Sequence, residues 1–224
     1  MISVVIPVLN EEGRLRELLD CLDGMKGSFE VIVVDGGSMD GTREVASGRA
    51  RVVECARGRA VQMNRGAELA ARDVLFFLHA DCLPEKEAFI EIEELMKEPG
   101  VVGGALRYDV ADKSLLYRNH VFWSRLRARL TGIYLGDHGI FVRRSVFDRV
   151  GGFPPIPLME DVALCRRLKE EGRLVQAKSR IWASTRRFKN QGFVRTVLQM
   201  WANRLLFWLG VPPERLARFY GDAR

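Results

Sequence analysis

The run Val74-Leu75-Phe76-Phe77-Leu78-His79-Ala80-Asp81-Cys82 places five apolar residues directly before a histidine and an aspartate. The apolar part has the length of a buried strand, and the polar residues mark where that strand ends. Ligands of an open α/β sheet bind at the carboxyl ends of its strands, so a carboxylate here can reach a metal ion or a phosphate. Asp81 is equally suited to cap a helix, because residues 82–85 (CLPE) can begin one.

Apolar runs and amphipathic segments alternate around this stretch. The first run, residues 1–8, is rich in β-branched residues, which favours a strand buried on both faces. Asn10 is a candidate N-cap for the helix that follows. Further strands are expected at 29–34, 51–54 and 74–78, and helices at 10–22, 42–46, 58–71 and 85–97. This alternation predicts a parallel, doubly wound sheet with right-handed crossovers.

The pattern changes after Pro99-Gly100. Strands are expected at 101–110, 140–143, 174–177 and 181–184, and helices at 115–130, 145–150, 162–171 and 192–210. The pair Gly103-Gly104 lies inside the first of these strands. It predicts either a bulge or a close approach of the backbone to a ligand.

Composition limits the class of protein. The chain has 224 residues, 47% of them hydrophobic and 29% charged, which is ordinary for a soluble globular protein. Its four cysteines are far apart, which suits a reducing compartment and argues against a zinc site or a disulfide framework. No signal peptide is expected. The chain has no GxxxxGK[ST] motif and no GxGxxG after the first strand, which argues against P-loop and Rossmann nucleotide sites.

Positive charge is concentrated in the last part of the chain. The net charge is +6, and residues 163–224 contain fourteen Lys and Arg against four Asp and Glu. Such an excess suits nucleic acid, anionic lipid or a phosphorylated substrate, and it also suits an ordinary solvated surface.

The expected helix at 192–210 carries an apolar stripe, but its apolar run is too short to span a membrane. Its pattern favours docking against the domain or a second copy over contact with a membrane surface. The stripe recurs every three or four residues and consists of Phe193, Val197, Met200, Trp201, Leu205 and Trp208.

Polar side chains follow three strands of the predicted parallel sheet. Asn10-Glu11 follows the first strand, Asp35 the second and Asp81 the fourth. The carboxyl ends of parallel strands meet at one edge, so these residues are expected to converge. Three such groups at one edge predict a ligand with hydrogen-bond donors, or a cation.

The loop Asp35-Gly36-Gly37-Ser38 is small and flexible, so a flat base has room to lie against its backbone. Arg57 and Arg59 follow on the same side of the sheet. A guanidinium binds phosphate with two parallel hydrogen bonds, which makes these arginines candidate phosphate partners.

Four segments, in this order, resemble a family 2 glycosyltransferase with the GT-A fold. They are residues 4–11 (VVIPVLNE), 33–42 (VVDGGSMDGT), 78–81 (LHAD) and 159–161 (MED). The residues Gly136-Asp137, 151–153 (GGF) and 157–161 (PLMED) resemble a compact bacterial and archaeal subgroup of that family.

The resemblance covers about residues 1–185 and implies a doubly wound, mostly parallel α/β sheet with a small antiparallel portion. It implies one catalytic domain over 1–185, with a nucleotide-sugar and metal half (1–98) and an acceptor and catalytic-base half (99–185). A C-terminal helical extension (186–224) follows.

The implied activity is transfer of a sugar from a nucleotide-diphosphate donor to an acceptor hydroxyl, with inversion at the anomeric carbon. By resemblance, Asp35 accepts a hydrogen bond from the base beside Ser38, and Arg59 lies near the diphosphate. The other residues expected to line the donor pocket are Pro7, Asn10, Glu11, His79 and Ala80.

Two acidic motifs divide the chemistry in this interpretation. Asp81 matches the last Asp of the family's DxD motif and would hold Mg²⁺ or Mn²⁺ against the diphosphate. Asp161, with Glu160 beside it, matches the general base that deprotonates the acceptor. Taken without the resemblance, Glu160 and Asp161 are also suited to cap the following helix.

His79 departs from the family pattern, because it stands where the DxD motif has its first Asp. A histidine supplies no negative charge, although it can bind the ribose or act as a nitrogen ligand. Metal affinity is therefore expected to be lower, or the preference to move toward metals that accept nitrogen.

Two other functions fit parts of the pattern. A nucleotidyltransferase on a related scaffold usually carries Gly-x-Gly-x-Arg after its first strand, where this chain has residues 7–11 (PVLNE). A non-enzymatic module that binds an anionic polymer or a membrane would not need both Asp81 and Asp161. The expected partners are a nucleotide-sugar donor and an unidentified acceptor, without nucleic acid. The expected location is the cytoplasm, or the inner face of a membrane.

Overall fold

The computed structural model describes residues 1–220. The strands are β1 (Ile2–Val8), β2 (Phe29–Asp35), β3 (Arg51–Glu54), β4 (Val74–Phe77), β5 (Cys82–Pro84), β6 (Val101–Val110), β7 (Ile140–Arg143) and β8 (Arg173–Ala183). The helices are α1 (Glu12–Asp23), α2 (Thr42–Ala46), α3 (Arg59–Leu69), α4 (Ala88–Leu95), α5 (Leu115–Thr131), α6 (Arg144–Arg149), α7 (Glu160–Glu171), α8 (Arg186–Gln191), α9 (Phe193–Trp208) and α10 (Pro213–Tyr220). A short 3₁₀ helix, η1, covers Gly136–His138.

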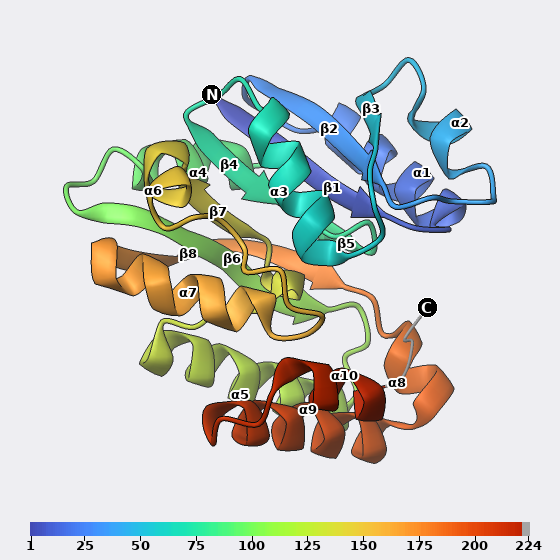
Figure 1. Ribbon diagram of the computed structural model, residues 1–224, viewed down its shortest axis with the longest axis vertical. Helices are drawn as coiled ribbons and strands as arrows, with labels where there is room; N and C mark the ends of the chain where they lie inside the picture. The colour runs from blue at the N-terminus through green and yellow to red at the C-terminus, as the bar shows by residue number, and fades with distance from the viewer. Residues whose placement is uncertain (221–224) are drawn as a thin grey trace.

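One sheet organises the molecule, with strand order β3-β2-β1-β4-β7-β6-β8-β5 (Figure 1). Strands β3, β2, β1 and β4 are parallel, as the alternation of strands and helices predicts. Strand β7 is antiparallel to both β4 and β6, and β5 is antiparallel to β8. The fold class is therefore α/β, with a mostly parallel sheet and a few antiparallel strands. Strands from residues 1–98 and from 99–185 belong to the same sheet.

The core lies on both faces of β1. Val4, Ile6 and Val8 pack into a cluster that includes the buried leucines of α1. Val5 points the other way, into a cluster with Ala60 and other residues of α3. Successive side chains of a strand point to opposite faces, so a strand covered on both sides is apolar at nearly every position. The exception in β1 is Ser3, whose hydroxyl donates to Glu30 Oε1 at 2.6 Å. The expectation of a strand buried on both faces is confirmed.

The sheet curls, and the curl places Asp81. Only residues 78–81 separate β4 from β5, yet β5 pairs with β8 at the far end of the strand order. The chain leaving β8 consequently meets the chain leaving β4, where the Ser184 N–H donates to the Asp81 carbonyl oxygen at 3.0 Å.

The structure corrects the expectation that residues 82–85 begin a helix capped by Asp81. Residues 82–84 form β5 rather than the start of a helix, and α4 begins only at Ala88, so Asp81 is not a helix N-cap. Pairing with β8 and burial of Cys82 and Pro84 decide this short segment. The two strands expected at 174–177 and 181–184 are one strand, β8, which pairs with β6 on both sides of an irregularity at residues 177–179.

The pair Gly103-Gly104 lies at an irregularity of β6, whose register against β8 shifts between Val101 and Gly103. The predicted bulge is confirmed, and the close backbone approach is to neighbouring strands. A Cβ on Gly104 would lie 2.0 Å from the Val175 carbonyl oxygen, which is part of β8. Backbone of a paired strand has little freedom to move away.

Gly104→Ala is therefore expected to lower the free energy of unfolding by roughly 2–4 kcal/mol, because the sheet must distort to admit a methyl group. Urea denaturation followed by circular dichroism measures the change. Gly13→Ala is the matched control, since a Cβ there meets no atom within 4 Å and lies in α1. Equal stability of the two variants would contradict the argument.

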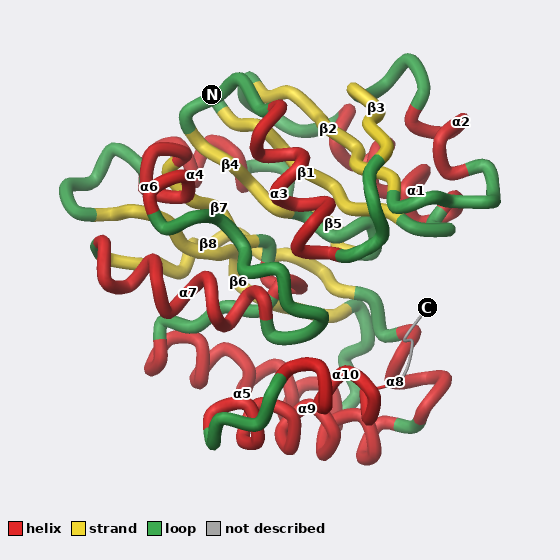
Figure 2. Tube along the Cα trace, viewed as in Figure 1, coloured by secondary structure: helices red, strands yellow, loops and turns green. Residues whose placement is uncertain are grey.

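Helices α5, α8, α9 and α10 gather at one end of the long axis, away from β1, β2 and β3 (Figure 2). Helix α5 packs on β6, and α9 lies beside α5, with the rings of Tyr117 and Phe193 5.0 Å apart. Three of these helices lie in the expected extension 186–224, of which residues 221–224 are outside the described residues. Within residues 1–220, no helix is long and apolar enough to cross a membrane.

Candidate functional site

A cleft of about 720 Å³ opens at the carboxyl ends of β1 and β4. The start of α3, the loop at 155–158 and the chain after β8 complete its walls. The sheet edge thus forms the cavity that its polar loops predict. The expected site residues that line it are Pro7, Glu11, Arg59, His79, Ala80 and Asp81.

A smaller pocket of about 200 Å³ adjoins the cleft and shares Arg59, His79 and Asp81 with it. Glu160 and Asp161 line this smaller pocket. The fold therefore brings the two acidic motifs, far apart in sequence, to one cavity.

Asp161 lies in the first turn of α7, and two backbone groups hold its carboxylate. Oδ2 accepts from the Gly136 N–H at 2.7 Å, and Oδ1 accepts from the Val162 N–H at 2.7 Å. The N-cap residue of α7 is Met159, whose side chain makes no cap hydrogen bond, so neither Glu160 nor Asp161 is the N-cap. Both lie in the first turn, where Asp161 accepts from an N–H of its own helix. Met159 has φ 67°, a strained conformation for a residue with a Cβ, and such strain often accompanies functional sites.

Glu160 and Arg59 form an ion pair of 3.1 Å between the starts of α7 and α3. Glu160 is only 3% exposed, and a buried carboxylate needs such a partner. Because Arg59 lines both cavities, the pair fixes a guanidinium at their junction. The geometry thus gives Glu160 a role in holding Arg59.

Asp137 on η1 is a fourth carboxylate of the smaller pocket, and the sequence reasoning missed its role. Burial, followed by the negative charge of Asp161, raises the pKa of Asp137 to about 7; Asp81 adds to the shift, and Arg127 opposes it. Within residues 1–220, its Oδ1 accepts no hydrogen bond. The sequence pointed to Asp137 only through the Gly136-Asp137 motif. It was not selected as a site residue because it follows no strand of the parallel half.

These carboxylates fit a divalent cation that is shared with a substrate. Asp81 and Asp137 offer oxygen ligands, which Mg²⁺ and Mn²⁺ prefer. The described part of the chain contains no group of three His, Cys, Asp or Glu side chains that would hold a metal by itself. Magnesium is commonly held by one or two carboxylates together with substrate phosphates, so an incomplete protein set suits such an ion.

His79 lies between the two acidic motifs. A Cβ on Gly136 would lie 2.6 Å from Cε1 of His79, so the imidazole packs directly against the backbone of η1. The same glycine donates its N–H to Asp161. His79 therefore also supports the loop that orients Asp161.

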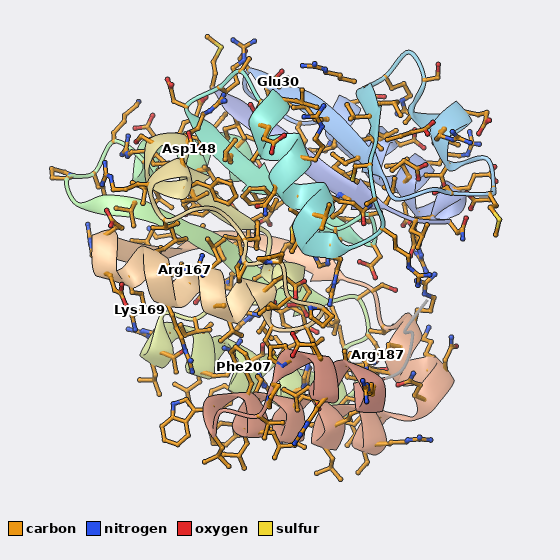
Figure 3. All side chains as sticks on the ribbon, viewed as in Figure 1. Glu30, Asp148, Arg167, Lys169, Arg187 and Phe207 are labelled. Carbon is orange, nitrogen blue, oxygen red and sulfur yellow. The ribbon has the colours of Figure 1, made fainter. Side chains whose placement is uncertain are left out.

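Arginines give the cleft a positive wall. Arg57, Arg59, Arg186 and Arg187 all line it, and Arg186 Nη2 lies 3.0 Å from Glu11 Oε1. Burial, followed by the positive charge of Arg59, lowers the pKa of Arg187 (labelled in Figure 3) to about 10. Arg186 and Arg187 belong to α8, a helix that the sequence reasoning did not predict. Clustered guanidiniums of this kind suit a phosphate ligand.

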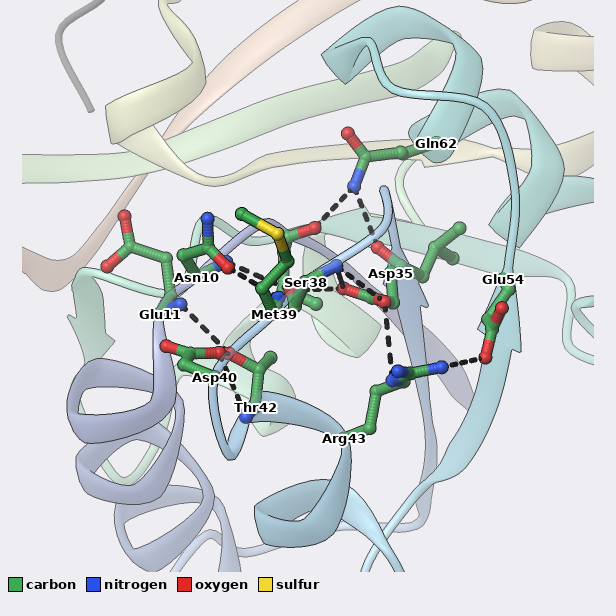
Figure 4. Close-up of polar contacts among 12 residues, drawn as sticks. Asn10, Glu11, Asp35, Ser38, Met39, Asp40, Thr42, Arg43, Glu54 and Gln62 are labelled. Carbon is green, nitrogen blue, oxygen red and sulfur yellow. Dashed lines mark hydrogen bonds and ion pairs between the residues drawn. The ribbon is translucent and has the colours of Figure 1, made fainter.

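Asp35, Ser38 and Asn10 form a network behind the cleft and do not line it (Figure 4). Asp35 is fully buried and accepts from the Ser38 N–H at 3.1 and 3.0 Å. The Asn10 N–H donates to Ser38 Oγ at 2.9 Å, and Asn10 Oδ1 accepts from the Met39 N–H at 2.8 Å. The sequence predicted that Asn10 caps α1, and this is wrong. Asn10 instead joins the loop after β2 to the end of β1.

Gln62 is a further residue that the sequence reasoning missed. It is fully buried on α3, and its Nε2 donates to the carbonyl oxygens of Val8 and Val34, both at 2.8 Å (Figure 4). It therefore joins the ends of β1 and β2 beneath the cleft. The sequence could have revealed Gln62 as a polar residue between Ala60 and Met63, which face inward.

Comparison with known proteins decides the family. Residues 3–151 match the family model described as glycosyl transferase family 2. This chain belongs to glycosyl transferase family 2. The match covers β1 to α6 and therefore most of the residues that line the larger cleft.

Two curated relatives illustrate the similarity. The chain is 27% identical to glycosyltransferase AglE of Haloferax volcanii, over 68% of this chain and 56% of that protein. It is 29% identical to an undecaprenyl-phosphate 4-deoxy-4-formamido-L-arabinose transferase of Aeromonas hydrophila, over 64% of this chain and 48% of that protein. The chain thus spans about half the length of these relatives.

A solved structure shows the same fold. Glucosyl-3-phosphoglycerate synthase of Mycobacterium tuberculosis, in complex with Mn²⁺, UDP and glucosyl-3-phosphoglycerate, aligns with a TM-score of 0.65. The alignment covers 95% of this chain and 81% of the synthase at 21% identity. At that identity the likeness establishes the GT-A fold alone.

Proposed function

We propose that this family 2 chain transfers a sugar from a nucleotide-diphosphate donor to an acceptor hydroxyl, with a divalent metal ion and inversion at the anomeric carbon. The observation that carries the proposal is that Asp81 and Asp161 line one pocket, which opens into an arginine-lined cleft. The synthase with the same fold was solved with Mn²⁺ and UDP, which supports this choice of ligands.

The larger cleft suits the donor. Its volume of about 720 Å³ is in the range of small-molecule sites. Arg59 and Arg187 stand where they can hold the diphosphate, and Pro7 and Glu11 form the wall at the end of β1. Asp35 is fully buried and does not line the cleft, so we give it an indirect role in place of the expected contact with the base. Its bonds to Ser38 hold the loop after β2, which the Asn10 N–H joins to the end of β1.

Departure of the nucleotide diphosphate develops negative charge on the leaving oxygen. Asp81 would hold the divalent ion, with Asp137 beside it, and a bound ion neutralises charge on that diphosphate. The guanidiniums of Arg59 and Arg187 add fixed positive charge on the same side. The protein thereby stabilises the leaving group before transfer begins.

We infer that Asp161 takes the acceptor proton. It lines the smaller pocket and not the cleft, whereas Arg59 and Arg187 line both cavities. The Gly136 N–H fixes its orientation. As the acceptor oxygen bonds to the anomeric carbon, its proton passes to Asp161 and the bond to the diphosphate breaks. Attack opposite the leaving diphosphate would invert the configuration in a single displacement.

Donor binding tests the proposal directly. UDP-, GDP- and dTDP-sugars are screened by thermal shift with Mn²⁺, Mg²⁺ or EDTA. At a donor concentration of about 100 Kd, stabilisation by roughly 2.7 kcal/mol raises Tm by about 5–10 °C, and we expect this only when metal is present. The anomeric configuration of the product is then read by NMR.

The screen has clear opposing outcomes. A shift below about 1 °C for every donor, with and without metal, would contradict the proposed function. Equal Tm shifts in Mn²⁺ and in EDTA would contradict the proposed metal dependence. A product with retained anomeric configuration would contradict the proposed inversion.

A further inference from the structure

Helix α9 exposes a continuous apolar stripe on the side opposite its buried face. Thr196 and Asn203 are buried, and Met200 faces the core with them. At 100° per residue the exposed positions point about 180° away from these. Their exposed fractions lie between 51% and 71%, and the residues are Val194, Leu198, Trp201, Leu205 and Trp208. The predicted stripe of this helix is thus divided, since Phe193, Val197 and Met200 pack inward while Trp201, Leu205 and Trp208 do not.

Helix α5 repeats this arrangement beside it. Tyr117, Val121 and Ala128 are buried on one side of α5. The opposite side carries apolar residues with exposed fractions between 50% and 81%, namely Leu115, Phe122, Trp123 and Leu130. The two helices form the outermost layer at one end of the molecule, and side chains project from it into open space (Figure 3). We name the exposed side of α5, α8 and α9 the helical face.

The helical face is also cationic. Residues 113–135 and 184–213, which contain α5, α8 and α9, include no Asp or Glu. The exposed cations around the apolar stripes are Arg118, Arg129, Lys189 and Arg195, and Lys113 beside them is paired with Asp109. Apolar residues flanked only by positive charge are typical of helices that lie in the interface of an anionic membrane.

We propose that the helical face binds the surface of an anionic phospholipid bilayer. Three of the chain's four tryptophans, Trp123, Trp201 and Trp208, are exposed on it, and tryptophan prefers the boundary between headgroups and acyl chains. A second copy of the chain would bring two cationic faces together, which costs energy, whereas an anionic surface complements them. The face does not need a membrane-spanning helix to bind in this way.

Helix α9 connects the membrane surface with the site. Its inner side supplies Thr196, Met200 and Arg204 to the smaller pocket, while Trp201 and Leu205 point outward. A helix with its side chains is about 10 Å thick, so the pocket lies about that distance from the bilayer. An acceptor held at the bilayer surface would then need little displacement to reach the pocket.

Vesicle flotation of the whole chain tests the inference without donor or acceptor, so its result is independent of the proposed function. The vesicles are phosphatidylcholine alone and equal parts of phosphatidylcholine and phosphatidylglycerol. The chain is expected to float with the anionic vesicles only, and less at 0.5 M salt than at 0.1 M. Brominated acyl chains are expected to quench its tryptophan fluorescence.

Paired variants distinguish binding through the helical face from non-specific adsorption to vesicles. Trp201→Gln with Leu205→Gln is expected to weaken binding to anionic vesicles more than tenfold, and Arg129→Gln with Arg195→Gln about fivefold to tenfold. Ile90→Gln on α4 and Arg16→Gln on α1 are exposed controls and should bind like the unaltered chain.

Three results would overturn the inference. The chain does not float with anionic vesicles, or the Trp201/Leu205 variant floats as well as the unaltered chain. The third is a dimer in sedimentation equilibrium that this variant converts to a monomer, without vesicle binding by either protein, because the face would then bind a second copy. Thermal melts of each variant confirm that the substitutions leave the fold intact.

Discussion

Asp161→Asn is expected to lower kcat for sugar transfer by about 10³-fold while the donor Kd stays within about twofold. An amide cannot accept the acceptor proton, and general-base catalysis typically contributes 10²–10⁴-fold. Donor binding is spared because Asp161 does not line the larger cleft. An asparagine can keep one hydrogen bond to the Gly136 N–H through its carbonyl oxygen, so η1 should stay in place.

Steady-state kinetics and calorimetry with donor and Mn²⁺ separate these two effects. Glu170→Gln removes a carboxylate from the exposed side of the same helix and should leave both constants unchanged. A kcat within fivefold of the unaltered enzyme would exclude Asp161 as the base. A parallel loss of Tm and kcat would instead indicate a structural role.

Asp81→Asn is expected to weaken Mn²⁺-dependent donor binding by about 10²-fold, because a neutral amide replaces the carboxylate that holds the ion against the diphosphate. Affinity for the donor in EDTA should change little. Calorimetry in both conditions measures the difference. Asp148→Asn is the matched control, because Asp148 is exposed on α6 (Figure 3) and distant from both cavities.

The neighbouring His79→Asp variant sharpens this test. It adds a carboxylate at the position where the family motif has one, and tighter Mn²⁺ binding than in the unaltered chain would show that His79 limits the affinity. If Asp81→Asn binds donor and Mn²⁺ as tightly as the unaltered chain, Asp81 is not the metal ligand.

The sequence predicted the parallel half of the fold because each strand there is specified locally. Residues 2–8 are apolar except for Ser3, residues 74–77 are apolar throughout, and the helices between strands show their 3.6-residue period. It did not predict β5, because Cys82 to Pro84 has no strand pattern of its own. Pairing with β8, a partner distant in sequence, decides those residues.

The site shows the same division. The sequence identified Asp81 and Asp161 from their motifs, and the structure places both in one pocket. It did not identify Asp137, whose raised pKa depends on two carboxylates from other elements, or the two arginines of α8. Local pattern cannot reveal a charge whose neighbours come from other parts of the chain.

By itself, the sequence determined the α/β class, the parallel direction of the strands in the first half and the positions of the two acidic motifs. Hydrophobic periodicity and the residues at strand ends carry that information locally. Only the tertiary structure decided the curl of the sheet that joins β5 to β8, the ion pair of Arg59 with Glu160, and which side of α9 is exposed. These depend on contacts between segments far apart in the chain, where burial and charge pairing outweigh local preference.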